Sequence, residues 1–300
     1  MFYVLTHRFP LSEFLFCGHK EIVPLLLPTR KLSFGARMMK RIQFFLCYFL
    51  HINFFFNFFP SEIYEKLRSL KKEDSLIFVG ESLQMSLILS RICPNVKKIA
   101  YFWNPCSRIS KCESHIKRIK CMGFSIATFD NDDAKKYNLI FAPQFYREIP
   151  PNCLCNEIKN DFFFCGKNKG RKDFLLKLEH VLSSRGSCNF IIPERNDAMQ
   201  YLDYIEELKR SRILCDVNQN GQSGLTLRVL ESLFFQKKLI TNNENIYNYD
   251  FFKESNILVI NESISREKIE KFLSIPFEPY NVNVLKKYEV TNVLRGLTND

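Results

Sequence analysis

The sequence lacks the signatures of several common protein classes. Its eleven cysteines include no CxxC pair, its five histidines accompany no serine or cysteine nucleophile motif, and no internal repeat or low-complexity tract is present. A zinc site, a hydrolase triad and a repeat architecture are therefore not indicated. The N-terminus MFYVLTHRFP also lacks the basic start and long apolar centre of a signal peptide, so we expect no export.

The cysteines and the overall composition describe an intracellular globular chain. The cysteines are odd in number, scattered and mostly inside apolar segments, which is typical of reduced cytosolic thiols. With 300 residues, of which 46% are hydrophobic and 25% charged, the chain can bury a substantial core. Its length favours two domains over one.

Positive charge is concentrated in the first half of the chain. Residues 1–150 contain 22 Lys and Arg against 12 Asp and Glu, a net charge of +10, whereas residues 151–300 contain 21 against 20, a net charge of +1. We therefore expect the first half to bind an anionic partner.

The segment RIQFFLCYFLHINFFFNFFP, residues 41–60, raises the question of membrane contact. It is long enough to span a bilayer, but polar residues interrupt it, namely Gln43, His51, Asn53 and Asn57. The preceding Arg37, Lys40 and Arg41 resemble the cationic flank of a segment that lies on an anionic membrane surface. The sequence favours surface association, and a buried helix or strand and a true span stay open as alternatives.

From residue 75 onward the chain alternates between short β-rich runs and amphipathic stretches of helix length. The predicted strands are 75–80, 98–103, 123–129, 161–166, 188–193, 212–218, 237–243 and 256–260. This alternation is typical of parallel sheets with helices on both faces. A polar, proline-bearing stretch, 147–160, breaks the pattern and marks the predicted domain boundary. We therefore predict domains at 1–155 and 156–280, and a C-terminal helix in 281–300 that packs back on the first domain.

Two glycine-containing turns follow predicted strands of the second domain. In FCGKNKGRKD, residues 164–173, Gly166 and Gly170 allow close approach of a ligand, and Lys167, Arg171 and Lys172 can neutralise a diphosphate. In NQNGQSG, residues 218–224, the turn precedes a helix whose N-terminus suits a phosphate. Such turns at the carboxyl ends of parallel strands indicate a nucleotide site.

Glu231 lies on the helix that follows the second turn. Leu227, Leu230 and Phe234 form the stripe that packs on the sheet, and Glu231 falls off that stripe. Its carboxylate could accept hydrogen bonds from the paired hydroxyls of a ribose. The alternative is an ordinary solvated glutamate.

The stretches DFFFCGKNKGR and SGLTLRVLESLFFQKKLITNN resemble the donor-binding domain of GT-B glycosyltransferases from bacterial lipopolysaccharide and capsule biosynthesis. YFWNP and FSIATFDNDDAKKYNL resemble the N-terminal half of the same enzymes, so the resemblance covers most of the chain from about residue 75. It implies an α/β fold of GT-B type, with two Rossmann-like domains whose parallel sheets face each other across a cleft. It also implies that Glu231 holds the ribose and Arg171 the diphosphate.

One position departs from the resemblance. Many relatives of this fold carry a second acidic residue eight positions before the ribose glutamate, where this chain has Ser223. The donor sugar would then be held differently. The residues expected to bind the donor are Gly166, Lys167, Arg171, Lys172, Ser223, Gly224, Arg228 and Glu231.

The resemblance further implies transfer of a sugar from a nucleotide-diphosphate donor to a growing surface glycan such as lipopolysaccharide, O-antigen or capsule. The donor is a substrate, so we expect no cofactor, and no metal if Arg171, Lys172, Arg228 and a helix N-terminus stabilise the leaving phosphate. If the reaction inverts configuration, Glu81 at the end of a predicted strand is the candidate general base. We expect a cytoplasmic enzyme on the inner face of the membrane, with a glycan or lipid-linked acceptor bound to the first domain.

Two other functions compete with this hypothesis. Asp130 and Asp132 follow a predicted strand and match the metal motif of GT-A glycosyltransferases, although aspartates at this place also cap helices. A basic binding module without enzymatic activity could use Tyr101, Trp103 and Phe145 to stack bases. No nucleic-acid-binding motif is present, so we expect no nucleic-acid partner and interpret Trp103 as a packing residue.

Overall fold

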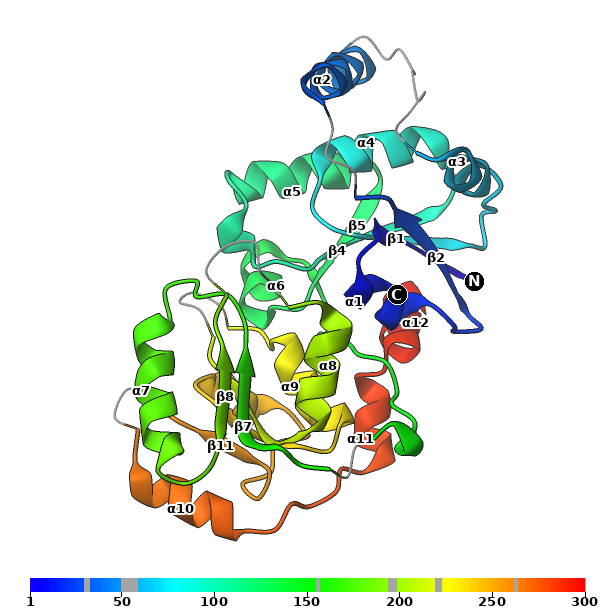
Figure 1. Cartoon of the computed structure of the whole chain (residues 1–300). Coiled ribbons are helices and arrows are strands. Elements are labelled where there is room, and N and C mark those ends of the chain that lie inside the picture. The colour runs from blue at the N-terminus through cyan, green and yellow to red at the C-terminus, as the bar shows by residue number, and fades with distance from the viewer. Residues whose placement is uncertain are drawn as a thin grey trace. The chain divides into compact units, whose positions relative to one another are not determined.

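The computed structural model describes residues 1–29, 33–49, 59–154, 157–193, 199–218, 223–261 and 264–299. These residues form two compact units, shown in Figure 1. The first contains Met1–Ala142 and Leu294–Asp300, and the second contains Pro143–Val293. Residues 143–155 belong to the second unit, where the Tyr146 amide donates to Tyr288 O and the Val290 amide donates to Tyr146 O.

The first unit contains a six-stranded parallel sheet in the order β2-β1-β3-β4-β5-β6. Its strands are β1 (Phe2–His7), β2 (Ile22–Leu27), β3 (Ser75–Val79), β4 (Lys97–Phe102), β5 (Phe124–Thr128) and β6 (Ile140–Phe141). The strands predicted at 75–80, 98–103 and 123–129 are confirmed. β1 and β2 were not predicted, although FYVLTH and IVPLLL are β-rich runs.

Helices cover both faces of the first sheet. They are α1 (Pro10–Phe16), α2 (Phe34–Phe49), α3 (Ser61–Arg68), α4 (Leu83–Ile92), α5 (Cys112–Cys121) and α6 (Asn131–Tyr137). Figure 1 shows α3, α4 and α5 on one face and α1 on the other. Because βαβ crossovers are right-handed, a sheet that grows in both directions from β1 and β3 must place these helices on opposite faces.

The second unit repeats this architecture with five parallel strands in the order β11-β10-β9-β7-β8. Its strands are β7 (Asn160–Cys165), β8 (Cys188–Ile191), β9 (Ser211–Asp216), β10 (Lys238–Thr241) and β11 (Ile257–Val259). Its helices are α7 (Lys172–Ser183), α8 (Tyr201–Lys209), α9 (Leu227–Phe234), α10 (Arg266–Ser274) and α11 (Val282–Lys287). The strands predicted in this half are therefore confirmed.

The run of three phenylalanines in β7 shows how the second core is divided between the two faces of the sheet. Phe162 and Phe164 pack with Leu175 and Leu178 of α7, whereas the Phe163 ring lies 5.5 Å from the ring of Tyr204 on α8. Side chains alternate between the faces of a strand, so consecutive aromatic residues serve two helix layers.

Each sheet contains one point at which the chain reverses its direction of growth. In the first sheet this point lies between β1 and β3, and in the second it lies between β7 and β9. The loops that leave the carboxyl ends of two such strands diverge to opposite faces, which opens a crevice between them. The fold thus provides one natural ligand position in each unit.

Buried lysines at the starts of two strands cap the carboxyl ends of helices, α4 before β4 and α10 after β10. Lys98 of β4 donates to the carbonyl oxygens of Cys93, Pro94 and Val96 at distances of 2.9, 3.0 and 2.9 Å. Lys238 of β10 donates to the carbonyl of Phe272 (2.7 Å) and to that of Ile275 at the end of α10. An ammonium group there satisfies unpaired helix carbonyls and complements the helix dipole.

The segment expected to touch a membrane is described only in part. Residues 41–49 form the end of α2, whereas 50–58 lie outside the described residues. Within the described ranges, no helix combines the length and apolarity needed to cross a bilayer.

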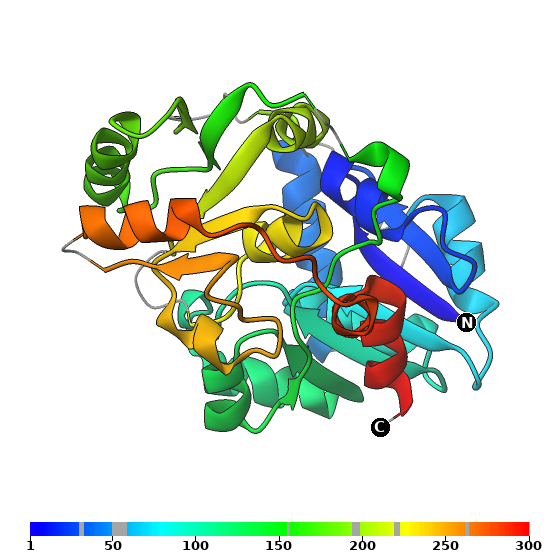
Figure 2. The ribbon, with the colours of Figure 1, turned by 90° about the horizontal axis from the view of Figure 1, so that it is seen from below.

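The C-terminal stretch 281–300, expected as one helix, forms α11 and α12 (Val290–Asn299). From Leu294 onward α12 belongs to the first unit. There Arg295 pairs with Glu21 at 2.7 Å, and Lys97 Nζ donates to Thr298 O at 2.9 Å. Figures 1 and 2 both show the end of α12 beside the N-terminal strands of that unit.

The Lys98→Met substitution should lower the free energy of unfolding by about 1–3 kcal/mol, because it leaves buried carbonyl groups at the end of α4 without their donor. Urea denaturation would measure the change. Lys117→Met, which removes an exposed lysine of α5, is the matched control and should change stability by less than about 0.5 kcal/mol. Equal effects of the two substitutions would contradict the capping role.

Candidate functional site

Two arginines converge on the turn that follows β7. A β-carbon added to Gly166 would lie 2.9 Å from Nη2 of Arg171 and 3.2 Å from Nη1 of Arg228. Both guanidinium groups also lie 5.1 Å from the centre of the Phe164 ring. A side chain at position 166 would therefore shift the two guanidinium groups. The Gly166 amide itself donates to Ile191 O at 3.0 Å.

Arg228 is fixed by a buried carboxylate at the end of β9. Its Nε lies 3.0 Å from Oδ1 of Asp216, and its Nη1 donates to Cys165 O at 3.2 Å. Asp216 also accepts hydrogen bonds from Thr226 (2.8 Å) and Thr241 (3.3 Å). Burial lowers the pKa of Arg228, but the charges of Asp216, Tyr204 and Glu231 and the hydrogen bond to Asp216 together outweigh burial and raise this pKa above its ordinary value.

Arg171 is buried without a carboxylate partner among the described residues. Its Nη1 donates to Val217 O, its Nη2 donates to Lys167 O at 3.2 Å, and its Nε has no hydrogen-bond partner in the described part of the chain. Burial, and then the neighbouring charge of Arg228, lower the pKa of Arg171 to about 10, so the group stays charged at neutral pH. One acid and two arginines leave this site with an excess positive charge.

These groups lie at the carboxyl edge of the second sheet, where its strand order reverses between β7 and β9. Gly166 follows β7, and Asp216 ends β9. Thr226 is the N-cap residue of α9, but its side chain accepts no cap hydrogen bond from the helix. Its hydroxyl donates to Asp216. The first turn of α9 therefore adds amide groups and the positive end of a helix dipole to the same edge.

Glu231 does not occupy the environment expected from the helical pattern. Its side chain is 1% exposed, so it is neither solvated nor on an open face. Tyr201 donates to Oε1 at 3.0 Å, and Tyr204 donates to Oε2. The paired hydroxyls that the carboxylate binds in this structure therefore come from α8, which covers the side of α9 that the sequence pattern left open.

A chain of hydroxyl groups continues from Glu231 to the segment before β7. The hydroxyl oxygens of Tyr146 and Tyr201 are 2.6 Å apart. Burial raises the pKa of Glu231 to about 7, although hydrogen bonds from the tyrosines and the charge of Arg228 oppose this shift. Because Glu231 is 1% exposed, a ribose could reach its carboxylate only if the packing around it changed.

The remaining residues predicted to bind the donor are at the rim of this site. Lys167 is exposed on the turn before α7, Lys172 is exposed at the first residue of α7, and Gly224 is buried ahead of α9. The Ser223 carbonyl accepts from the amides of Asn243 (3.4 Å) and Asn245 (3.3 Å). The predicted turn residues 219–222 lie outside the described residues.

Glu81, the candidate base, is in the first unit and has a well-defined position. Gly80 before it has φ +151°, a backbone conformation that favours glycine. His115 bonds the Glu81 carbonyl, and Asn104 donates to the Glu81 carboxylate at 3.2 Å. Ser82, the next residue, caps α4 by accepting from the Met85 amide, so the carboxylate of Glu81 is left beside the helix start.

Asp130 of the competing metal motif caps a helix. Its Oδ1 accepts from the amides of Asp132 (3.1 Å) and Asp133 (3.2 Å) at the start of α6. Asp132 itself is exposed. Within the described ranges, no three residues of the types His, Cys, Asp and Glu converge as a group that could hold a metal ion.

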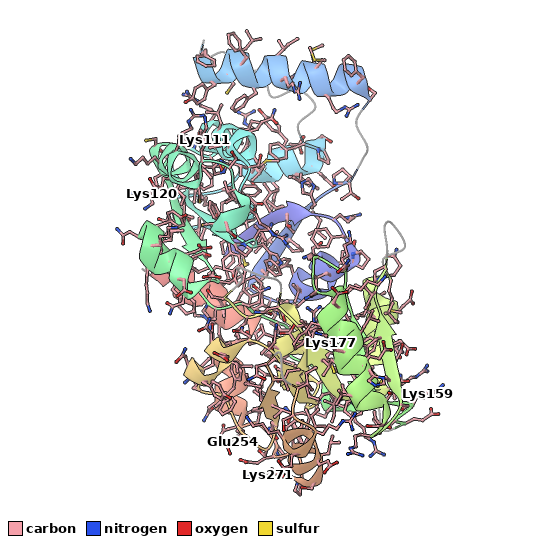
Figure 3. All side chains as sticks on the ribbon, turned by 90° about the vertical axis from the view of Figure 1, so that its left-hand side faces the viewer. Lys111, Lys120, Lys159, Lys177, Glu254 and Lys271 are labelled. Atoms are coloured by element: carbon pink, nitrogen blue, oxygen red, sulfur yellow. The ribbon has the colours of Figure 1, made fainter. Side chains whose placement is uncertain are left out.

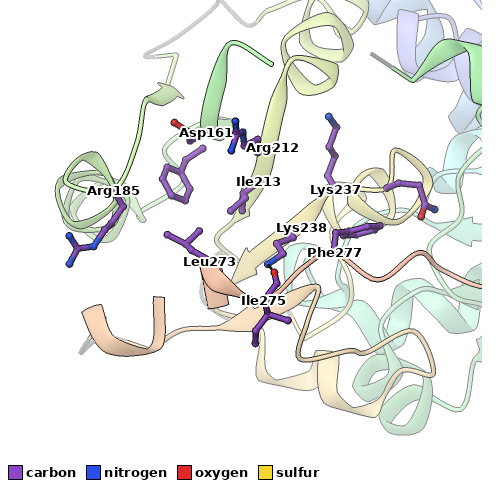
Figure 4. Close-up of a pocket in the computed structure, with 11 residues that line it drawn as sticks. Asp161, Arg185, Arg212, Ile213, Lys237, Lys238, Leu273, Ile275 and Phe277 are labelled. Atoms are coloured by element: carbon purple, nitrogen blue, oxygen red, sulfur yellow. Dashed lines mark hydrogen bonds and ion pairs between the residues drawn. The ribbon is translucent and has the colours of Figure 1, made fainter. Parts of the chain in front are cut away.

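A pocket of about 430 Å³ lies at the opposite, amino-terminal edge of the second sheet (Figure 4). Its positive groups are already engaged in the structure. Lys237 donates to Lys209 O at the end of α8 (2.7 Å), Lys238 caps α10, and Arg212 lies 3.4 Å from Asp161. Figure 4 shows the Lys237 and Lys238 side chains pointing in opposite directions. These lysines are helix caps, and we do not assign the pocket to the nucleotide.

Sequence reasoning missed three residues on which this site depends. Asp216 was only a polar residue near the end of a predicted strand, and its side-chain partners come from two other segments, the start of α9 and β10. Tyr201 and Tyr204 could have been noticed, because a spacing of three residues places both hydroxyls on one face of a helix. Their partner Glu231 is 27 or more residues away, so no local pattern could identify the contact.

No protein-family model and no curated protein matches this sequence. Solved structures do match its fold. An alpha-glucosyltransferase in complex with UDP and DNA aligns over 99% of this chain and 98% of its own, with a TM-score of 0.57 and 10% identity. HepE from Anabaena in complex with UDP aligns over 99% and 98%, with a TM-score of 0.50 and 9% identity.

At this identity the likeness establishes the fold. The chain has the two-sheet, Rossmann-like α/β architecture of GT-B glycosyltransferases, which confirms the fold class expected from the sequence. The roles of the site residues stay predictions.

Glu231 should make stability dependent on pH. Its pKa is raised on folding, so the native state binds the proton more tightly than the unfolded chain does, and stability falls as pH rises from about 4.5 to about 7. The slope is about 1.4 kcal/mol per pH unit for one group. The Glu231→Gln variant has no titratable group at this position. The unfolding free energy of the variant minus that of the wild type should therefore increase over that range and level off above it.

Chemical denaturation at several pH values measures this difference. Glu206→Gln removes an exposed glutamate of α8 and is the control, with a difference that stays constant. A pH-independent difference for Glu231→Gln would show that the carboxyl group is ionised throughout.

Proposed function

We propose that this protein is a glycosyltransferase that takes a sugar from a nucleotide-diphosphate donor. The observation that carries the proposal is the pair of arginines beside Gly166, which among the described residues bonds one carboxylate, that of Asp216, and leaves the buried Arg171 Nε without an acceptor. A buried positive charge without a counter-ion is costly, so the site favours an anionic ligand. The two solved structures of this fold reported above both contain UDP.

The same groups suit the chemistry of sugar transfer. As the bond between the anomeric carbon and the phosphate oxygen breaks, negative charge grows on the leaving diphosphate. Arg171, Arg228 and the first turn of α9 would stabilise that charge without moving, because their positions are fixed by Asp216, Val217 and Cys165. This arrangement supports a reaction in which arginines, and no metal ion, neutralise the leaving group.

We extend the proposal to the acceptor and to the cellular role of the enzyme. We place a glycan or lipid-linked acceptor on the basic first unit and assign the enzyme to the synthesis of a bacterial surface glycan at the inner face of the membrane. Exposed cations of this unit include Lys111, Lys120 (both labelled in Figure 3), Lys117 and Arg118. In an inverting reaction Glu81 would accept the proton of the attacking hydroxyl.

Helix α2 supplies the surface that supports membrane association. Phe34, Met38, Ile42, Phe45 and Phe49 follow a helical spacing and are all exposed, with Arg37 and Arg41 exposed beside them. Cys47 is buried on the opposite side of the helix. An exposed apolar stripe with a cationic edge matches a helix that lies in the interface of an anionic bilayer.

Arg171→Met should weaken nucleoside diphosphate binding about tenfold or more, because it removes a charge-assisted donor but keeps much of the side-chain stem. Thermal shift with UDP, GDP, CMP and dTDP, each with Mn²⁺ or EDTA, would measure binding. We expect one nucleotide to stabilise the wild type equally well in EDTA.

Arg212→Met is the control for that experiment. Arg212 is in the same unit, at the other edge of the sheet, and should leave the shift unchanged. A shift that requires Mn²⁺, or the absence of a shift with every nucleotide, would contradict the proposal.

Ile42→Asp should reduce binding to vesicles that contain anionic lipid by about tenfold or more, because it places a charge in the apolar stripe of α2. Cosedimentation at increasing salt would measure it, and binding of the wild type should fall as salt rises. Leu176→Asp on α7 is the matched control, since Leu176 is 46% exposed and Ile42 is 49% exposed. Salt-independent or absent binding of the wild type would contradict membrane association.

A further inference from the structure

A second pocket, of about 250 Å³, lies within the first unit at the carboxyl edge of its sheet. It is built around the ends of β1, β3 and β4, which is where the strand order of this sheet reverses. Such a crevice is the expected ligand position in an open parallel sheet. Its volume is just below the usual range for ligand sites, about 300–1,000 Å³, which suits one ring rather than a chain of rings.

The walls of this pocket combine aromatic surface with a few polar groups. Phe9, Leu11, Leu15 and Trp103 provide apolar surface, and Phe9 is 42% exposed although it lines the pocket. The polar lining includes His7, Glu81 and Asn104. Trp103, interpreted from the sequence as a packing residue, is only partly buried and forms part of this wall.

The charge of the lining contrasts with that of the unit as a whole. Among the described residues that line the pocket, none is Lys or Arg, and Glu81 contributes a carboxylate. The net charge of +10 on residues 1–150 is therefore carried outside this pocket. A phosphate or carboxylate would meet like charge here, whereas a neutral ring would not.

Glu81 is held in place as a hydrogen-bond acceptor. The turn at Gly80, the bond between His115 and the Glu81 carbonyl, and the donation from Asn104 to its carboxylate fix both the backbone and the side chain. Asn104 bonds Oε1, so the carboxylate keeps capacity to accept a hydroxyl from a ligand.

We infer that this pocket binds one neutral sugar ring of the acceptor. The ring places its C–H face against Trp103 and Phe9 and donates a hydroxyl to Glu81. This inference rests on the proposed glycosyltransferase function and adds the chemical class of the acceptor group. The anionic parts of the acceptor bind outside the pocket, on the basic surface of the unit.

Trp103 makes this inference directly testable, because it is the single tryptophan of the protein. Its fluorescence can be titrated with methyl glycosides of glucose, galactose, mannose and N-acetylglucosamine, and with methyl glucuronide as the anionic counterpart of the glucoside. We expect a saturable change with at least one neutral glycoside and at least tenfold weaker binding of the glucuronide.

Variants separate this pocket from other surfaces. Phe9→Ala should weaken the neutral glycoside about three- to tenfold, because it removes one stacking surface. Phe141→Ala is the matched control, since Phe141 is equally exposed at 42% and lies on β6 outside the pocket lining. Glu81→Gln should narrow the preference for the glucoside over the glucuronide, because it removes the repelling charge.

The outcomes distinguish this inference from the proposed function. Fluorescence that responds to no neutral glycoside, or that responds equally to glucuronide, overturns the sugar pocket even if a nucleotide stabilises the protein. Equal effects of Phe9→Ala and Phe141→Ala overturn it as well. A saturable neutral-sugar response in a protein that binds no nucleotide would instead retain the pocket and refute the nucleotide-sugar donor.

Discussion

The carboxylate of Asp216 connects the strands and the helix that meet at the carboxyl edge of the second sheet. It is fully buried at the end of β9 and binds Thr241 of β10, Thr226 ahead of α9 and Arg228 within α9. Through Arg228 the same network reaches the carbonyl that ends β7. Burying an ion pair gains little stability by itself, but removing one partner leaves an uncompensated charge that costs about 3–5 kcal/mol. Three strands and one helix are therefore fixed at the edge where a ligand is expected.

The electrostatics of the site follow from that arrangement. Asp216 is bonded to Arg228, so among the described residues no acid pairs with Arg171, which packs against the same phenylalanine ring. The two oxygens of Glu231 are bound by tyrosines, and burial raises its pKa to about 7. A negatively charged ligand would balance the charge of this cluster, which is the physical basis of the nucleotide proposal.

The two units place different charges at the same position of one topology. Both sheets reverse their strand order beside their own first strand, which is where open parallel sheets bind ligands. Among the described residues, this edge has two arginines and one bonded acid in the second unit, and aromatic rings with a carboxylate in the first. The proposed transfer from an anionic donor to a neutral hydroxyl would use this difference in charge.

Hydrophobic periodicity and turn chemistry are local properties, so the α/β class, the βαβ order from residue 75 and the glycine turn at Gly166 could be predicted from the sequence. Arg171, Arg228 and Glu231 were predicted to bind the donor, and those roles stay predictions. Three further facts came only from the tertiary structure: among the described residues no acid pairs with Arg171, Tyr201 and Tyr204 donate to Glu231, and Trp103 lines a pocket with Glu81. Those facts depend on segments tens of residues apart being packed together. Burial and pairing between distant segments leave no periodic signal in the chain.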